Sequence, residues 1–577
     1  MCAGPVTGDT MALLERSQHS HRRLSLLALL NQLQANPDVV GKNVEPERAW
    51  QILVEAERRD SAAVADILMY PTVGVWLTRA LHNTMPGRTA PWPELGYLHL
   101  IAAAAAVRCG YACTVRVPVW HGTVSLPTVG HARIPGTFPV GAVDVICAGA
   151  ESQIRVNPAT GIPLGSDVSA FVPARLHRST SRGLTLSAWL EDKDPYHGFG
   201  EPRPPTELAE SEFAEWRKLL DEAWDVLTLS HSEHARELAA GLRALGPIEP
   251  DLDTVGASSP AAFGGIRLSA NGSATEFAEA LVHEMQHSKL NAVLGLVQLT
   301  DDDSGRRYLA PWRDDPRPLV GVCHGVYAFT CGVEFWLTQE PTTRDAETRR
   351  MTFSIAHRRA QLRRALHTLR TSGHLTRPGS ALVDAVSARL AVCEEAPVSA
   401  ALSQTVIAMV DDHQALWRLR YGRPDAGPVT TLATAWLDGA NAPAWSGGCR
   451  IVTQDDHRRL PSNRRTLLRA KATEPELFAS MVHRPAALPG TTPRADAALC
   501  TGDHLGAAAA YEHRLREEPD DAQAWVGLGL AWHAQGRNAA ALLEHPELTV
   551  AVHRRVRMLG GRAPDPAALA AWVGSAL

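Results

Sequence analysis

Apolar residues along most of this chain recur with the spacing of an α-helix. Residues 24–33 and 49–69 are two such runs without an internal Gly or Pro, and residues 203–245 contain a third. The pattern changes to alternating apolar and polar positions at residues 113–119, and a turn at residues 121–122 then leads into a second short strand. We therefore expect a mainly α protein of the α+β kind with one small β section.

Residues 273–294 carry the clearest helix prediction. Ser273 and Glu276 have the spacing of a capping box, in which each side chain bonds a backbone N–H at the start of the helix. No Gly or Pro interrupts the segment until Gly295. Residues 263–269, just upstream, are typical of a short strand. A strand followed by a metal-binding helix is expected of a zincin-like core.

This predicted helix contains the motif His-Glu-x-x-His. His283 and His287 are four residues apart, so their imidazoles lie one above the other on one face and can bind one metal ion. Glu284 projects to the side of that face, where a glutamate can hold and deprotonate a metal-bound water. The same five letters also occur by chance, and a histidine pair can simply line a polar helix face.

A catalytic metal needs a third protein ligand. The two helical turns after His287 supply neither a carboxylate nor a histidine. We favour His324, which lies beside Gly325 in an apolar segment where a buried imidazole needs a partner. The competing interpretation is a core histidine bonded to a backbone carbonyl. Glu334 is the second candidate, although a solvated helix charge is its simpler interpretation.

Residues 311–318 form a stiff, charged block with three prolines. Arginine binds carboxylates through two parallel hydrogen bonds, so a rigid arginine near a metal is suited to hold a dicarboxylate cosubstrate. Asp314 and Asp315 compete with this reading, because they can simply pair with the arginines. The candidate cosubstrate-binding residues are Tyr308, Trp312, Arg313 and Arg317.

Composition narrows the class of protein. The chain has 577 residues and a net charge of -5, which gives no electrostatic case for binding nucleic acid or an anionic membrane. Its nine cysteines include no C-x-x-C pair, which favours a reducing compartment. No stretch approaches 18 uninterrupted apolar residues, and we read no signal peptide at the N-terminus. We expect a soluble, cytoplasmic protein.

The length predicts several domains. We expect a helical N-terminal domain with the β section at 1–245, a metal-binding catalytic domain at 246–425 and a helical domain at 426–577. In the last, residues 507–519 and 525–532 are similar to the end of one tetratricopeptide repeat and the start of the next. The alternative is an ordinary helical hairpin. Either interpretation favours a module that contacts protein or peptide.

Several segments together resemble a known family. They are residues 281–292, 311–318 and 324–329. With them, the chain is similar to the HExxH-motif peptide-modification proteins that accompany ribosomally synthesised, post-translationally modified peptides, including systems with radical-SAM maturases. Residues 118–127 and 190–196 look like further landmarks, so the resemblance covers roughly residues 20–400. It is far more specific than the five-letter motif alone.

The resemblance implies Fe(II)- and 2-oxoglutarate-dependent β-hydroxylation of a residue in a precursor peptide, using dioxygen and releasing succinate and carbon dioxide. His283 and His287 match the ligand positions of the motif, and His324 would be the third ligand. Glu284 would orient a ligand or a metal-bound water. Arg317 or Arg313 would bind the distal carboxylate of 2-oxoglutarate. The implied partners are the precursor peptide and other maturation enzymes.

Two other functions stay open. Imidazole suits zinc as well as iron, so a zinc metallopeptidase with Glu284 as general base is the first alternative. Glu334 or His324 would then be its third ligand. The second is a precursor-binding scaffold without catalysis that uses the C-terminal helical region.

Overall fold

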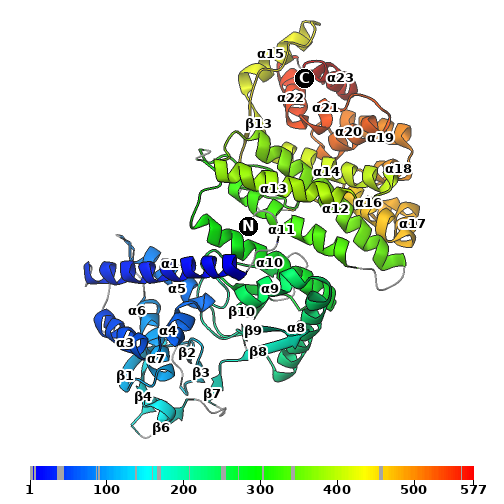
Figure 1. Ribbon diagram of the computed structural model, residues 1–577. Helices are drawn as coiled ribbons and strands as arrows, with labels where there is room; N and C mark the ends of the chain where they lie inside the picture. Colours follow the sequence, from blue (N-terminus) through cyan, green and yellow to red (C-terminus); the bar gives the residue numbers. More distant parts are fainter. Residues whose placement is uncertain are drawn as a thin grey trace. The chain divides into compact units, whose positions relative to one another are not determined.

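Two compact units make up the protein in a computed structural model, one reaching to Val297 and the other running from Gln298 to Leu577. Figure 1 traces their elements. Most of the described residues are helical and two larger β sheets are present, which confirms a mainly α fold with a β part. The division into three domains stays a prediction. The structure describes residues 4, 8–35, 44–85, 87–88, 91–136, 140–158, 160–164, 170–206, 208–248, 255–270, 272–301, 304–339, 345–453, 459–560 and 562–577.

The first unit begins with helices that pack on an antiparallel sheet. These are α1 (Gly8–Ala35), α3 (Pro46–Arg59), α4 (Ser61–Leu68), α5 (Pro71–Asn83), α6 (Trp92–Leu95) and α7 (Tyr97–Arg108). Helix α7 lies against the central strand of the sheet. Its residues 102–106 are all alanine and fully buried. Because these side chains are small, the helix and the sheet can approach closely.

The antiparallel sheet has seven strands in the order β6-β5-β4-β1-β2-β3-β7. Strand β1 pairs with β4 along its whole length but with β2 at one position only, Trp120 opposite Thr123. His121 and Gly122 join β1 to β2 with positive φ angles of 48° and 73°, as a tight hairpin turn requires, so the predicted hairpin is confirmed. The strands are β1 (Cys113–Trp120), β2 (Thr123–Leu126), β3 (Gly130–Arg133), β4 (Val140–Cys147), β5 (Gln153–Asn157), β6 (Thr160–Pro163) and β7 (Phe171–Pro173), with a short 3-10 turn at Gly149–Glu151.

A second sheet of five strands, in the order β11-β12-β10-β9-β8, completes the first unit. Strands β9, β10 and β12 run parallel, whereas the edge strands β8 and β11 are antiparallel to their neighbours. The strands are β8 (Leu176–Ser181), β9 (Leu184–Leu190), β10 (Ala244–Pro247), β11 (Gly256–Ala257) and β12 (Gly265–Leu268); the helices are α8 (Glu210–Ser230), α9 (Ser232–Gly241) and α10 (Ala274–Leu294). The β part is therefore much larger than the small section that the sequence predicted.

A buried polar cluster ties the loop after β9 to the helices of the first unit. The hydroxyl of Tyr97 donates to Asp194 Oδ2 at 2.6 Å, and Tyr70 donates to Glu191. The Glu191 Oε1 atom also accepts from the backbone N–H groups of Lys193 and Asp194, at 2.7 and 2.8 Å. Asp194 is fully buried, and burial together with the charge of Glu191 raises its pKa to about 7. The segment 190–196 thus has a clear structural role.

Titration of Asp194 should make the first unit less stable as the pH rises. Its pKa in the folded chain is above the ordinary 3.8, so the folded state holds this proton over a range in which the unfolded chain has lost it. The stabilisation is complete below about pH 4 and is lost as the pH rises through about 7, with a slope of at most ~1.4 kcal/mol per pH unit. Asp194→Asn, which mimics the neutral acid, should flatten this part of the profile. Urea unfolding of both proteins between about pH 5 and 8 measures the difference, and parallel profiles would assign the proton to another group.

The second unit is almost entirely helical. After the Pro-rich block it begins with the helices α11 (Leu319–Thr338) and α12 (Asp345–Thr371). A short antiparallel pair, β13 (Gly422–Pro424) and β14 (Cys449–Ile451), lies among the helices. The helices are α11 (Leu319–Thr338), α12 (Asp345–Thr371), α13 (Arg377–Glu394), α14 (Ala400–Tyr421), α15 (Ala426–Leu437), α16 (Asn463–Thr473), α17 (Pro475–His483), α18 (Pro493–Thr501), α19 (His504–Glu517), α20 (Ala522–Ala534), α21 (Ala540–Leu543), α22 (Pro546–Gly560) and α23 (Pro566–Gly574), with a 3-10 turn at Pro485–Ala487.

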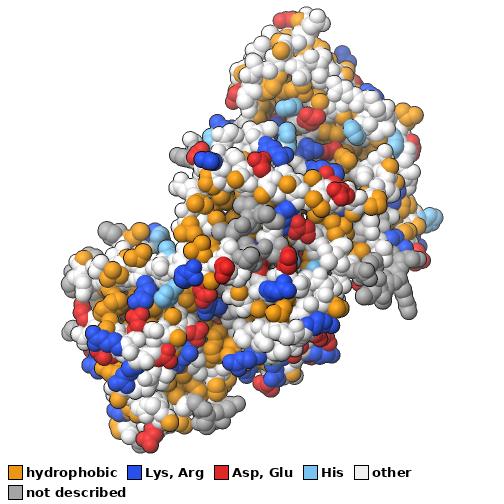
Figure 2. Space-filling view, viewed as in Figure 1, with side chains coloured by type: hydrophobic (Ala, Val, Ile, Leu, Met, Phe, Trp, Pro, Cys, Tyr) orange, Lys and Arg blue, Asp and Glu red, His pale blue; other side chains and the backbone are white. Residues whose placement is uncertain are grey.

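One helix of the second unit, α11, is long and apolar enough to cross a membrane, but 67% of its apolar window is buried inside the protein. It packs against α12 and α13, as the core helix of a soluble protein does. In the first unit, α4 and α5 are long and apolar enough to cross a membrane only if they are taken together as one span, and they meet at a bend of 65°. On the face drawn in Figure 2, Lys and Arg side chains are interspersed with Asp and Glu, and neither sign forms a continuous patch.

Candidate metal centre

Helix α10 holds the two motif histidines side by side. Ser273 and Glu276 form the predicted capping box, with the Ser273 hydroxyl accepting from the Glu276 N–H at 3.3 Å. The ring centroids of His283 and His287 are 4.9 Å apart, and the rings are nearly perpendicular at 83°. Both rings are partly exposed, while the residues that flank them along the helix are buried. The spacing therefore places both imidazoles on one face, as the sequence predicted.

Glu284 points to a different side and is buried against the edge strand β11. A side-chain Cβ at Gly256 of that strand would lie 2.6 Å from Glu284 Oε1, so the glycine makes room for the carboxyl group. Glu284 is 6% exposed. Burial raises its pKa to about 7, although a hydrogen bond with Ser258 opposes this shift. A carboxyl group with such a pKa can hold or release a proton near neutral pH.

The opposite side of α10 is fixed by a buried ion pair. Lys289 and Glu237 of α9 are each 1% exposed and form a salt bridge. Gln286 adds a hydrogen bond to Glu237 Oε2 at 2.9 Å. Burial opposes the charge of Glu237, but the bonds from His234, Lys289 and Gln286 outweigh it and lower its pKa to about 2. Because this network admits few rotations of α10, it sets the direction in which the histidine pair points.

His324 lies near the start of α11 in the second unit and is neutral around pH 7. Burial, aided by the charge of Arg317, lowers its pKa to about 4. A Cβ at the neighbouring Gly325 would lie 1.8 Å from the Trp312 ring, so this glycine accommodates the indole. The Trp312 ring also contacts Phe329, with centroids 4.9 Å apart. The group that packs against Gly325 is therefore Trp312 of the Pro-rich block.

Glu334 forms an ion pair with Arg389. The Nε atom of Arg389, on α13, donates to Glu334 Oε1 at 2.8 Å, and its terminal nitrogen pairs with the other carboxylate oxygen. The side chain of Arg389 is 8% exposed. Such a two-bond pair holds the carboxylate firmly. Glu334 is therefore part of an ion pair between two helices. This environment favours neither of the interpretations made from the sequence, a solvated helix charge or a metal ligand.

In the Pro-rich block, one of the two aspartates pairs with the arginines, as the competing interpretation proposed. Arg313 and Arg317 both bind Asp315, at 2.7 and 3.2 Å. Asp314 does not pair with them, because it accepts from His413 at 2.8 Å and from the backbone of Leu460 at 2.9 Å. The block closes on itself through a β-bridge between Tyr308 and Arg317. The side chain of Arg313 is 52% exposed and that of Arg317 is 38% exposed, so both stay accessible.

The predicted site residues therefore form two groups. The histidine pair and Glu284 share α10 of the first unit, while His324, Trp312 and the arginines share the start of the second unit. Within the part of the chain that the structure describes, no group of three or more His, Cys, Asp or Glu side chains is arranged to hold a metal ion. The ligand set of His283, His287 and His324 stays a prediction.

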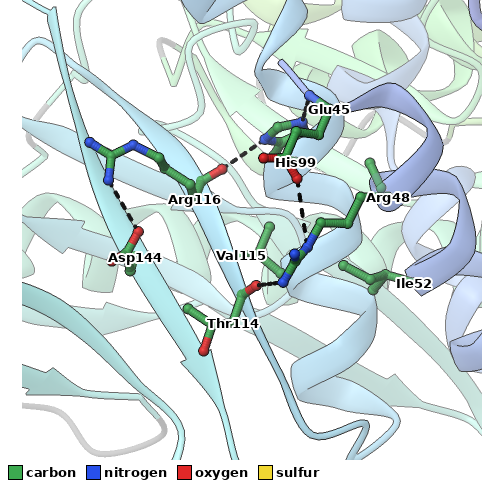
Figure 3. A pocket seen from close by; sticks show the side chains of 9 residues that line it. Glu45, Arg48, Ile52, His99, Thr114, Val115, Arg116 and Asp144 are labelled. Atoms are coloured by element: carbon green, nitrogen blue, oxygen red, sulfur yellow. Dashed lines mark hydrogen bonds and ion pairs between the residues drawn. The ribbon is translucent and has the colours of Figure 1, made fainter. Parts of the chain in front are cut away.

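Sequence reasoning missed a polar cavity of about 210 Å³ in the first unit (Figure 3). His99 lies at its wall, accepts from the Glu45 N–H at 3.0 Å and bonds the Arg116 carbonyl through Nδ1 at 2.7 Å. Arg48 donates to the Thr114 carbonyl at 2.9 Å. The two side chains therefore cap carbonyls on the edge of β1 that β2 leaves uncovered. The lining residues are Glu45, Arg48, Ala49, Ile52, His99, Thr114, Val115, Arg116 and Asp144.

Comparison with known proteins assigns no family. No family model matches the chain, and no curated protein is significantly similar to it. The resemblance to peptide-modification proteins therefore stays an expectation from the three motif segments. The function has to be argued from the chemistry of the two residue groups.

Proposed function

We propose that this protein is an Fe(II)- and 2-oxoglutarate-dependent peptide β-hydroxylase that acts on a ribosomally synthesised precursor peptide. The observation that carries the proposal is the pair His283 and His287, adjacent and partly exposed on one face of α10. Two imidazoles so placed are suited to hold one divalent transition metal. Bound Fe(II) with 2-oxoglutarate and dioxygen supplies the oxidising power for hydroxylation.

A zincin-like core around α10 forms part of the proposal. The parallel strands β9, β10 and β12, the antiparallel edge strand β11 and the motif helix that follows β12 support it. The support is an analogy of fold, and fold alone does not give function. An edge strand beside the motif helix can also pair with an extended peptide through its backbone, which suits a peptide substrate.

The chain's own groups have distinct parts in the proposed reaction. His283 and His287 bind the metal, and His324, which is neutral at pH 7, is our candidate for the third ligand. Arg317 or Arg313 binds the distal carboxylate of 2-oxoglutarate in place of Asp315, and Tyr308 and Trp312 hold the block that carries them. Glu284 orients a ligand or a metal-bound water from its buried position.

Anaerobic addition of Fe(II) and then 2-oxoglutarate to the full chain tests the proposal. We expect a weak visible charge-transfer band that appears only with both, and succinate release once dioxygen and a precursor peptide are added. His82→Ala, which removes an exposed histidine of α5, is the matched control and should keep the band. A chain that binds one equivalent of zinc tightly and shows no band would overturn the proposal.

A zinc metallopeptidase is the second candidate, because the pKa of Glu284 lies near 7. A general base works best when its pKa is close to the working pH. In that enzyme Glu284 would take the proton of a metal-bound water. Peptide cleavage without succinate would establish this candidate.

Glu284→Gln should separate the two enzymes. Glutamine keeps the size of the side chain beside Gly256 but cannot accept a proton. We expect a hydroxylase to keep part of its activity, whereas a peptidase should lose roughly 100-fold or more. Succinate release and product mass measure the first activity, and peptide fragments measure the second. Complete loss of hydroxylation at normal iron content would contradict the positioning role of Glu284.

We also propose that α19 and α20 form a tetratricopeptide-like hairpin that contacts the precursor peptide or another maturation enzyme. Gly527 supports this, because a Cβ there would lie 2.3 Å from the ring of Tyr511 on the facing helix. Trp525 and Trp532 are buried in the same hydrophobic core as Tyr511. A non-catalytic scaffold would bind its precursor peptide through this region alone. Metal content separates it from both enzymes.

A further inference from the structure

Two cysteines lie directly opposite each other in the antiparallel sheet of the first unit. Cys113 begins β1 and is the partner of Cys147 at the end of β4. The carbonyls of Thr114 and Arg116 accept bonds from Arg48 and His99, so they face away from β4 (Figure 3). Because backbone direction alternates along a strand, Cys113 and Cys147 form a hydrogen-bonded pair, whose Cα atoms are about 5.5 Å apart.

This separation lies within the range that a disulfide spans, about 4.4–6.8 Å between Cα atoms. The side chains of opposite residues point to the same face of a sheet. The two thiols are free and hydrogen-bond to each other. Cys147 is 2% exposed and also contacts the Ala103 carbonyl of α7, at 3.9 Å, whereas Cys113 is only partly buried. An oxidant can therefore reach Cys113 first.

The environment favours the thiolate of Cys113. The hydrogen bond from Cys147 lowers the pKa of Cys113, although burial opposes the shift. Burial raises the pKa of Cys109, the other cysteine in this part of the unit. Among the cysteines that the structure describes, Cys323, Cys393, Cys449 and Cys500 also have raised pKa values. A thiolate is the nucleophile in disulfide exchange, so Cys113 is the reactive position.

We propose that Cys113 and Cys147 form a reversible dithiol–disulfide site whose oxidant is a low-molecular-weight disulfide. The Cys113 thiolate attacks one sulfur of the small disulfide, breaks its S–S bond and releases one small thiolate. Cys147 then gives up its proton and attacks the Cys113 sulfur, which releases the second small thiolate. Both protein thiols are oxidised, the small disulfide is reduced to two thiols, and the two protein protons go to those thiols.

The site is independent of the proposed metal chemistry. The closed bond joins β1 to β4 beside Thr114 and Asp144, which line the polar cavity. It therefore fixes the strand pair that forms one wall of that cavity. Reduction by an excess of dithiol returns the free pair.

Oxidised glutathione, added to the native full-length chain, tests the proposal. We expect the loss of two titratable thiols and a protein mass lower by two hydrogens. After alkylation and trypsin digestion, the peptide 109–116 should be linked to the peptide 134–155. Both changes should reverse with dithiothreitol. Unchanged thiol content, or a link between other cysteines, would overturn the proposal.

Three serine variants locate the link. Cys109→Ser is the matched control, because it removes the second cysteine of the same tryptic peptide, and it should cross-link like the wild type. Cys147→Ser should stop at a glutathione adduct on Cys113, and Cys113→Ser should form neither adduct nor link. A link that persists in Cys113→Ser would contradict the assignment. The wild-type peptide map decides the question even where a variant folds poorly.

Discussion

His283→Ala and His287→Ala should each weaken metal binding by the full-length protein at least about 100-fold. Replacement of groups that merely support a metal ligand already costs roughly 10–100-fold in affinity, and a ligand itself should cost more. The two rings lie 4.9 Å apart and are partly exposed, so neither alanine opens a cavity in the core. Anaerobic equilibrium dialysis against Fe(II), with the bound metal quantified, measures the effect.

Two control variants make this test specific. His82→Ala removes an exposed histidine of the first unit and should leave the affinity unchanged. His324→Ala tests the predicted third ligand. Its matched control is His367→Ala, which removes an exposed histidine of α12. Loss of metal in both motif variants but not in His324→Ala would keep the histidine pair and reject His324. Full retention in His283→Ala would reject the metal centre itself.

The helix of the proposed centre was predictable because its signals are local. Ser273 and Glu276 fix its start, and the spacing of His283 and His287 needs only helical geometry. The burial of Glu284 was not predictable. It depends on Gly256, a glycine on a two-residue strand that no periodicity reveals.

The extent of the β part was missed for two reasons. Strand β9 does alternate, since Leu184, Leu186 and Ala188 are separated by polar residues, and this signal could have been used. Strands β10 and β11 have only four and two residues, too few to show a period, whereas β12 lies within residues 263–269, where the sequence did predict a strand.

Ion pairs between distant segments could not be predicted from the sequence either. Glu334 binds Arg389, which lies 55 residues later, and Asp314 binds His413, which lies 99 residues later. Charge pairing is readable over one helical turn, but any of many arginines could satisfy a distant carboxylate. The roles of Asp314 and Glu334 therefore depended on tertiary structure.

Arg464→Ala should destabilise the second unit by about 3–5 kcal/mol, because it leaves the buried Asp496 without its cation and the buried Asp412 with only its ion pair to Arg465. The Arg464 side chain is fully buried on α16, with Nε bonded to Asp412 and Nη1 to Asp496, each at 2.7 Å. Its Nη2 also donates to Gln523 Oε1 at 2.8 Å, and Tyr511 donates to Asp496 at 2.7 Å. The one guanidinium thus joins α16 to α14, α18 and α20.

Hydrogen exchange of these helices, together with urea unfolding, measures the loss. The exposed pair Arg554–Asp520 provides the control, since Arg554→Ala should change stability by less than about 1 kcal/mol. Adding Asp412→Asn and Asp496→Asn to Arg464→Met should recover much of the stability, because the buried charges are then removed together. If Arg464→Ala costs no more than Arg554→Ala, the buried network does not stabilise the unit. If the triple variant is as unstable as Arg464→Ala, the loss comes from packing and not from uncompensated charge.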